Sequence, residues 1–359
     1  MMKFFRRLLG RRRRTPRSRN TSVTVDIPLL RWVGPVVTVV AMFIILGMVV
    51  GGQINLAALD DYGDGEDGSS QLAGLTPVRL DSGGPKSNEA IRIATLHVDR
   101  LGDGDGVSAE SVTALVSMVS RFDIVALQGI QGSGAASIRS LVDVIRVSGG
   151  RYTASISEPI GRGNNLQSYA LIWDESRMRI VPGAVGIVDD SRDRMMFEPM
   201  YASFETRVGF ADGRRPFRFT LINAWAIDQS QGGPSDETSV LVDVFTSVRN
   251  YGYELAGEED CILLGDLGAT SDRLGALGQI PGVVSVVADG RNSQHILLDP
   301  NYTAEFTRQA GVLSASDLPE VSADALRSVS SQMPVWAELS VWEVPTMETG
   351  ASSRTEVIR

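Results

Sequence analysis

The stretch that most limits the possible folds is residues 261–270, with the sequence CILLGDLGAT. Its apolar run, residues 262–264, is followed at once by Gly265 and Asp266. A short apolar run that ends at glycine predicts a strand buried on both faces, as in α/β proteins. Asp266 then leaves the end of the strand, where α/β sheets build their binding sites. The sequence therefore predicts an α/β fold with a site near Asp266.

Further strands and helices are predicted on both sides of this stretch. The other expected strands are residues 91–97, 123–127, 169–173, 201–207, 217–227, 283–287, 295–298 and 335–344. Helices are expected where apolar residues recur at spacings of three and four, at residues 109–119, 137–147 and 240–248, and Ser108 is a suitable N-cap for the first. Helices alternate with strands early in the chain, and strands dominate its middle. This order favours two packed sheets with helices outside.

The net charge of −9 is unevenly distributed along the 359 residues. Residues 1–31 carry ten Lys or Arg and one acid, Asp26, whereas the rest of the chain carries 24 basic and 42 acidic side chains. Proteins that hold nucleic acid by its phosphates use clustered Lys and Arg. The acidic composition beyond residue 31 therefore argues against nucleic acid as a partner.

Residues 32–50, WVGPVVTVVAMFIILGMVV, contain no charged side chain. A helix of this length spans roughly 28 Å, which suffices to cross the apolar core of a bilayer. The segment is predicted to be a single transmembrane helix rather than a buried core helix or the apolar part of a cleaved signal peptide. The arginines of residues 1–31 then predict a cytoplasmic N-terminus, with the C-terminal domain outside the cytoplasm. The membrane is thus an expected partner.

The rest of the chain divides into three parts. Residues 51–89 are rich in Gly, Ser and acidic side chains and predict a solvated linker, because such a composition buries little apolar surface. Residues 90–345 are expected to form the globular domain, and residues 346–359 a polar tail. The single cysteine, Cys261, lies inside a predicted strand, so it is expected to be a buried thiol without an internal disulfide.

Eight segments, in order along the chain, resemble the endonuclease/exonuclease/phosphatase superfamily, also called the deoxyribonuclease-I-like family. They are IRIATLHV (91–98), RFDIVALQGI (121–130), SYALIWD (168–174), FEPMYASF (197–204), FTLINAWA (219–226), ILLGDLGAT (262–270), SQHILLDP (293–300) and SSQMPVWAEL (330–339). The eight segments occur in the same order along the chain as in the family, and this shared order indicates the family more strongly than any single match. The resemblance implies a four-layer α/β/β/α sandwich.

The resemblance also implies where the family's chemistry would lie. In this family, carboxylates hold a hard cation such as Mg²⁺, and histidines help water attack a phosphoester. The positions that match are Asp266, Glu198 and His295, and the family's first-strand Asn corresponds to His97. The other positions are replaced: the metal-binding Glu by Gly129, an Arg by Phe197, the catalytic His by Trp225, the signature Asn by Gly268, an Asp by Gln294, and the final Asp-His pair by Ser331 and Gln332.

These replacements imply that the fold is kept while catalysis is lost. One carboxylate holds Mg²⁺ poorly, and loss of acid–base groups alone lowers a rate by roughly 10²–10⁴-fold. The expected function is a membrane-anchored, catalytically inactive module that binds an unknown protein or envelope ligand, with no cofactor and no metal. The Asp266 side chain is as well suited to cap its own loop, by accepting backbone N–H bonds, as to bind a ligand.

The alternative is a divergent phosphoesterase or nuclease that uses Mg²⁺ or another divalent cation at a rearranged site. In that case His97, Asp266 and His295 could form a site of two histidines and one carboxylate, which suits a transition metal. Sequence alone leaves this possibility open, because such a site needs side chains that converge in space.

Overall fold

A computed structural model describes residues 86–99, 101, 108–132, 134–209, 213–227, 237–287 and 292–344. The predicted basic segment 1–31, the predicted membrane helix 32–50, most of the linker and the tail 346–359 lie outside the described residues. Among the helices that are described, none is both long enough and apolar enough to cross a membrane.

The apolar run at residues 262–264 forms the buried strand β9 (Cys261–Asp266) of a six-stranded sheet. The strand order in this sheet is β10-β11-β9-β8-β7-β6. Strands β8 and β9 pair in parallel, so Trp225 and Asp266 end them side by side, and the other pairs are antiparallel. Its other strands are β6 (Met178–Ile187), β7 (Met200–Thr206), β8 (Arg218–Trp225), β10 (Val284–Ser285) and β11 (Gln294–Leu298).

A second sheet of seven strands has the order β12-β13-β1-β2-β5-β3, with β4 paired to β5. Here β1 and β2 are parallel, with His97 opposite Gln128, and β1 is antiparallel to β13, with Ala90 opposite Ser340. The strands are β1 (Ala90–His97), β2 (Ile124–Gln131), β3 (Tyr152–Ile156), β4 (Ile160–Arg162), β5 (Asn165–Asp174), β12 (Phe306–Val312) and β13 (Val335–Ser340). Each sheet is thus mixed, with a parallel pair near its centre.

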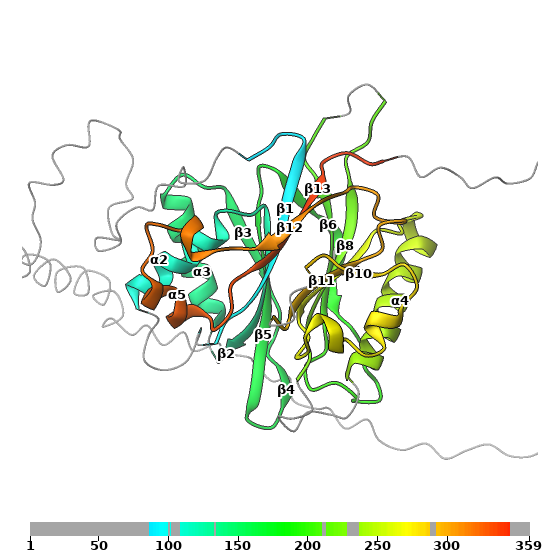
Figure 1. Cartoon of the computed structure of the whole chain (residues 1–359), viewed down its shortest axis with the longest axis horizontal. Coiled ribbons are helices and arrows are strands. Elements are labelled where there is room, and N and C mark those ends of the chain that lie inside the picture. Colours follow the sequence, from blue (N-terminus) through cyan, green and yellow to red (C-terminus); the bar gives the residue numbers. More distant parts are fainter. Residues whose placement is uncertain are drawn as a thin grey trace, which may run out of the picture. The chain divides into compact units, whose positions relative to one another are not determined.

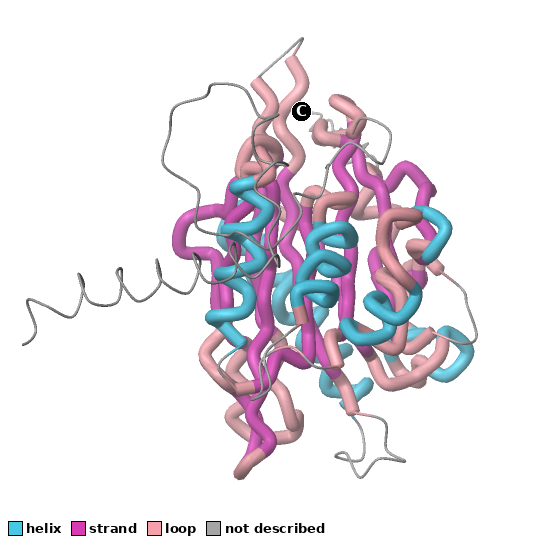
Figure 2. Tube along the Cα trace, turned by 90° about the vertical axis from the view of Figure 1, so that its left-hand side faces the viewer, coloured by secondary structure: helices cyan, strands magenta, loops and turns pink. Residues whose placement is uncertain are grey.

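Helices cover the outer faces of the two sheets (Figure 1). The seven-stranded sheet packs against α2 (Ala109–Val119), α3 (Gly134–Val147) and α5 (Ala323–Val329), and the six-stranded sheet packs against α4 (Glu237–Ala256). Figure 2 shows helices lying along the strands of the sheet beneath them. One apolar core lies under each helical layer, and a third lies between the sheets. The prediction of two packed sheets flanked by helices is confirmed.

Local signals explain the elements that were predicted correctly. The Ser108 hydroxyl accepts the N–H of Ser111 at 3.0 Å, so it caps α2 as expected. Cys261 is buried and unpaired, and burial raises the pKa of its thiol. Four strands and one helix add to the predicted set: β3, β4, β6, β12 and α5.

The added strands lie at the edges of the sheets, where the apolar pattern is weakest. Most of the side chains of β6 are half-buried or exposed, and the strand contains Pro182 and Gly183. Its pairing with β7 shifts register between Ile180 and Val185. Proline, glycine and register shifts are tolerated at a sheet edge, because one side of the strand has no partner to pair with. Such a strand cannot be recognised from alternating apolar residues.

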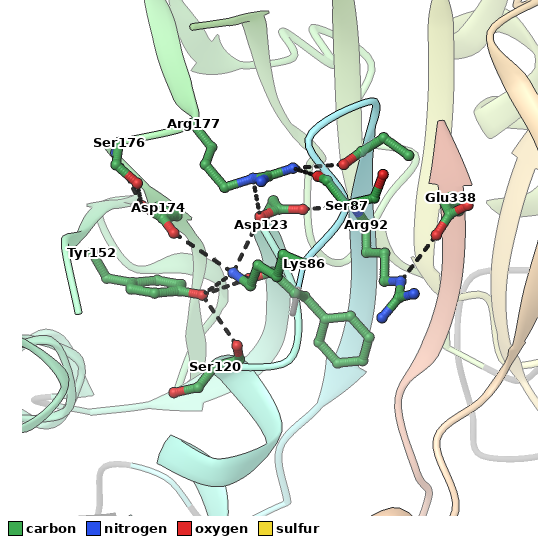
Figure 3. A network of polar contacts seen from close by, with 12 residues as sticks. Lys86, Ser87, Arg92, Ser120, Asp123, Tyr152, Asp174, Ser176, Arg177 and Glu338 are labelled. Atoms are coloured by element: carbon green, nitrogen blue, oxygen red, sulfur yellow. Dashed lines mark hydrogen bonds and ion pairs between the residues drawn. The ribbon is translucent and has the colours of Figure 1, made fainter. Parts of the chain in front are cut away.

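Residues 86–89, which composition assigns to the linker, contact the domain through Lys86 (Figure 3). The ammonium of Lys86 lies 3.1 Å from Asp123 and 3.6 Å from Asp174, and it donates to the Tyr152 hydroxyl at 2.7 Å. Burial and the two carboxylates raise the pKa of Tyr152, which therefore keeps its proton. Lys86 thus supplies a counter-charge to the buried Asp123 and Asp174 and joins residues 86–89 to the domain.

Candidate functional site

Asp266 lies where β9 ends, and its side chain reaches the space between the two sheets. Its Oδ2 is 3.7 Å from Nδ1 of His97, which ends β1 in the opposite sheet. Its Oδ1 accepts the N–H of Gly268 at 3.1 Å. Asp266 therefore caps its own loop, one of the two roles that its sequence allowed, and also faces an imidazole across the sheets.

His97 lies between two carboxylates without forming a close ion pair to either. Its Nε2 is 3.9 Å from Asp99 Oδ1, and its buried Nδ1 has no hydrogen-bond partner. Burial lowers the pKa of His97, although Asp266 and Asp99 oppose this shift. The imidazole is therefore neutral at pH 7, and a neutral ring does not compensate the charge of Asp266.

Gly129, where the resemblance implied a metal-binding glutamate, has surroundings that leave no room for a side chain. Its φ is +79°, and a Cβ would lie 2.6 Å from the Val98 carbonyl oxygen and 2.8 Å from two ring atoms of His97. The pairing of β2 with β5 also shifts here, between Leu127 and Ile130. The imidazole of His97 thus fills the space that a carboxylate at residue 129 would need.

Aromatic rings fill the neighbouring space. Phe197 and Trp225 stack with ring centroids 4.4 Å apart and planes 9° apart, and the Trp225 ring lies 4.7 Å from that of His97. The Tyr169 hydroxyl accepts the backbone N–H of Trp225 at 3.0 Å. Burial raises the pKa of Tyr169, with a smaller effect from Glu198, which is half-buried before β7. Two positions where the resemblance implied polar side chains are thus part of an aromatic stack.

The side chains of Gln294 and Gln332 form hydrogen bonds with other residues of the protein. Gln294 accepts the backbone N–H of His97 at 3.0 Å and donates to the Met333 carbonyl at 3.3 Å. Gln332 accepts the N–H of Ser293 at 3.2 Å and donates to its hydroxyl at 2.8 Å. The Ser331 N–H donates to Asp99 Oδ2 at 2.6 Å. These residues hold the loops at the ends of the strands together.

His295 does not join His97 and Asp266. It follows Gln294 along β11 and therefore faces the opposite side of the sheet. Its Nε2 donates to the Ala269 carbonyl at 2.7 Å, and its Nδ1 lies 3.1 Å from the Ser285 hydroxyl. Burial lowers the pKa of His295 as well. Because both ring nitrogens have protein partners, the structure does not form the candidate site of two histidines and one carboxylate.

Sequence reasoning missed Asp99 and the buried side-chain amides of Gln128 and Asn223. The amide of Gln128 donates to Asn223 Oδ1 at 2.6 Å and to the Thr95 hydroxyl at 3.0 Å, so it links the two sheets. Both amides are fully buried. Their signal in the sequence is a polar residue inside an otherwise apolar strand, which requires a partner that only the fold identifies.

The comparisons with known proteins point to deoxyribonucleases. The chain is 25% identical to human Deoxyribonuclease-1 over 187 residues, which is 50% of this chain and 61% of that protein. It is 28% identical to a Deoxyribonuclease of Thioalkalivibrio sp. (strain K90mix) over 118 residues, 33% of this chain and 31% of that protein. The chain therefore spans less than two thirds of the length of these curated relatives. No family model matches the chain.

Solved structures of similar fold include an endonuclease/exonuclease/phosphatase family protein from Bacteroides thetaiotaomicron. It is 15% identical, with a TM-score of 0.45, and the match covers 70% of this chain and 97% of that one. The two mixed sheets and the similarity to deoxyribonucleases define a phosphoesterase-like or nuclease-like α/β domain. Within this class, the similarity supports membership of the endonuclease/exonuclease/phosphatase superfamily.

Proposed function

We propose that this domain has lost the metal-dependent hydrolysis of its superfamily and acts as a membrane-anchored binding or scaffold module. The observation that carries the proposal is the position of His97 beside Gly129, where a Cβ would lie 2.8 Å from the ring. Mg²⁺ binding requires several oxygen ligands in a nearly octahedral arrangement. Here Gly129 supplies no carboxylate, and the neutral imidazole of His97 occupies the space beside it.

The groups that would move protons or stabilise phosphate charge are also engaged elsewhere. Trp225 replaces the family's catalytic histidine and stacks on Phe197. Gln294 accepts the backbone N–H of His97 at the end of β1, and Gln332 donates to the Ser293 hydroxyl. Asp266 itself uses one oxygen to cap its loop. The same side chains that remove catalysis therefore stabilise this end of the two sheets.

The full chain, purified in detergent, is expected to show no metal-dependent turnover of a generic phosphodiester or phosphomonoester with Mg²⁺, Mn²⁺ or Zn²⁺. Loss of acid–base help alone reduces rates by roughly 10²–10⁴-fold, and here several groups are lost together. Rates would be compared with those of the Asp266→Ala variant under the same conditions. Turnover that requires a cation and disappears in this variant would contradict the proposal.

A rearranged hydrolase is the second candidate, because His97 lies between Asp99 and Asp266. In this alternative, a hard divalent cation would bind the carboxylates, and the neutral imidazole would accept a proton from water. Activity would then disappear in both His97→Asn and Asp266→Ala, and its pH profile would have an acidic limb set by a pKa below 6.5. Activity that survives His97→Asn would exclude this role for the imidazole.

The proposed anchor is the uncharged segment 32–50, with residues 1–31 in the cytoplasm and the domain outside it. The proposed ligand is a protein or an envelope component rather than nucleic acid, because the sequence beyond residue 31 is acidic. A protease added after opening the outer barriers of intact cells is expected to digest residues 51–359. Protection of the domain against the protease would reverse the proposed orientation.

A further inference from the structure

Acidic side chains from both sheets meet at the end of β9 that is opposite to Asp266. Asp260 directly precedes β9, Glu305 directly precedes β12, and Glu343 follows β13. Each offers a carboxylate oxygen, and these oxygens lie within 4.8 Å of one another. Asp260 and Glu305 are 8% and 2% exposed, so at least two of these acids are almost fully removed from water. The cluster thus joins the two sheets at a point distant from the cleft.

Some polar atoms in this cluster have no hydrogen-bond partner. Oδ1 of Asp260 and Oε2 of Glu305 are buried and unpartnered. The Thr303 side chain is also buried, and its hydroxyl lies beside Asp260 and stabilises the charged form of that carboxylate. The second oxygens have ordinary partners, because Glu305 accepts the N–H of Val344 at 2.6 Å and Glu343 accepts that of Arg218 at 2.9 Å. The backbone thus fixes the carboxylates of Glu305 and Glu343, and their other oxygens face the neighbouring acids.

Positive charge within the described residues offsets the cluster only in part, since the charge of Arg215 lowers the pKa of Glu343 less than burial raises it. Arg215 and Arg218 line the adjacent cavity, but neither lies within ion-pair distance of Asp260, Glu305 or Glu343 in the described part of the chain. Burial, then repulsion from Glu305 and Glu258, raises the pKa of Asp260 to about 10. Burial also raises the pKa of Glu343 to about 7. Buried carboxylates without a close ion pair are costly, and they must share protons or bind a cation.

We propose that Asp260, Glu305 and Glu343 bind one hard divalent cation, with Ca²⁺ as the best match, and that this cation links the two sheets. Ca²⁺ takes six to eight oxygen ligands in flexible geometry, so carboxylates, the Thr303 hydroxyl and water can complete its shell. A cavity of about 470 Å³, lined by these acids and by Glu258, gives the ion a route from solvent. The site is structural and does not depend on the proposed loss of catalysis.

The test is calcium binding to the full chain in detergent at pH 7, measured by isothermal titration calorimetry and by the thermal unfolding midpoint. One Ca²⁺ per chain is expected, and an excess of about 100-fold over the dissociation constant should raise the midpoint by roughly 5 °C relative to EGTA. Glu305→Gln should weaken binding at least tenfold, because it removes a charge from the most buried ligand. Asp260→Asn should have a similar effect.

Asp324→Asn is the matched control, because this carboxylate is exposed on α5, where it pairs with Arg327, and the variant should leave calcium affinity unchanged. Folding of the Glu305→Gln variant is checked by its unfolding midpoint in EGTA, which should equal or exceed that of the wild type once carboxylate repulsion is relieved. Absence of saturable binding of Ca²⁺, Mg²⁺ or Mn²⁺ would overturn the proposal and leave shared protons as the explanation. Binding that survives Glu305→Gln but is lost in Asp266→Asn would overturn it too.

Discussion

Replacing Gly129 with glutamate is expected to destabilise the domain by roughly 3–4 kcal/mol rather than restore a metal ligand. The left-handed φ of +79° alone costs a side chain about 1–2 kcal/mol. The new Cβ would also displace the buried imidazole of His97 and approach the Val98 carbonyl oxygen, which belongs to the backbone and cannot move freely. Urea unfolding of the full chain, followed by circular dichroism, measures the loss.

Gly183→Glu is the matched control for this change. Gly183 has a φ of +77°, but nothing lies within 4 Å of the position of its Cβ. This variant should therefore lose only the backbone term of about 1–2 kcal/mol. Adding His97→Asn to Gly129→Glu should recover part of the loss, since the smaller amide vacates ring volume. Equal losses in the two glycine variants would show that His97 does not exclude a side chain at residue 129.

Asp123→Ala is expected to be the second large loss, of roughly 3–5 kcal/mol, because it removes the shared partner of two cations. Asp123 is 1% exposed, and one of its oxygens lies 3.1 Å from Lys86 and 2.8 Å from Arg177 (Figure 3). Its other oxygen accepts the N–H of Arg92 at 2.8 Å, at the start of β1. Removing the carboxylate would leave the charges of Lys86 and Arg177 partly buried and without the partner that they share.

The control for Asp123→Ala is Asp243→Ala, since Asp243, which lies on α4, forms an exposed ion pair with Arg194 at 3.0 Å. Exposed pairs contribute roughly 0–1 kcal/mol, so this variant should unfold at nearly the same urea concentration as the wild type. A midpoint for Asp123→Ala that matches the control would mean that the network around Lys86 is not needed for folding. The two variants change the same residue type, so composition does not confound the comparison.

The sequence was sufficient to predict the elements with strong local signals. Strand β9 has a continuous apolar run, and α2 has both an N-cap and an apolar face, so local chemistry defines them. The edge strands β3, β6 and β12 lack such signals, because their side chains contact a neighbour on only one side. Their pairing depends on the whole sheet, so it cannot be predicted from a short stretch of sequence.

The site could be predicted only in part for a related reason. The resemblance located Asp266, Gly129 and Trp225, but the position of the His97 ring beside Gly129 depends on the parallel pairing of β1 with β2. The separation of His295 from this group was open to prediction, because adjacent strand residues face opposite sides. The acidic cluster was not, since Asp260 and Glu343 are distant in sequence and carry no shared spacing.

The first and last described residues of the domain lie on the same side of it. The backbone N–H of Val341 donates to the carbonyl of Glu89 at 3.0 Å, so the polypeptide enters and leaves the described domain at one pole. His97 lies at the far end of β1, roughly 25 Å away at about 3.3 Å per residue. Asp266 and Trp225 thus lie at the pole of the described domain that is opposite to the entry and exit of its chain.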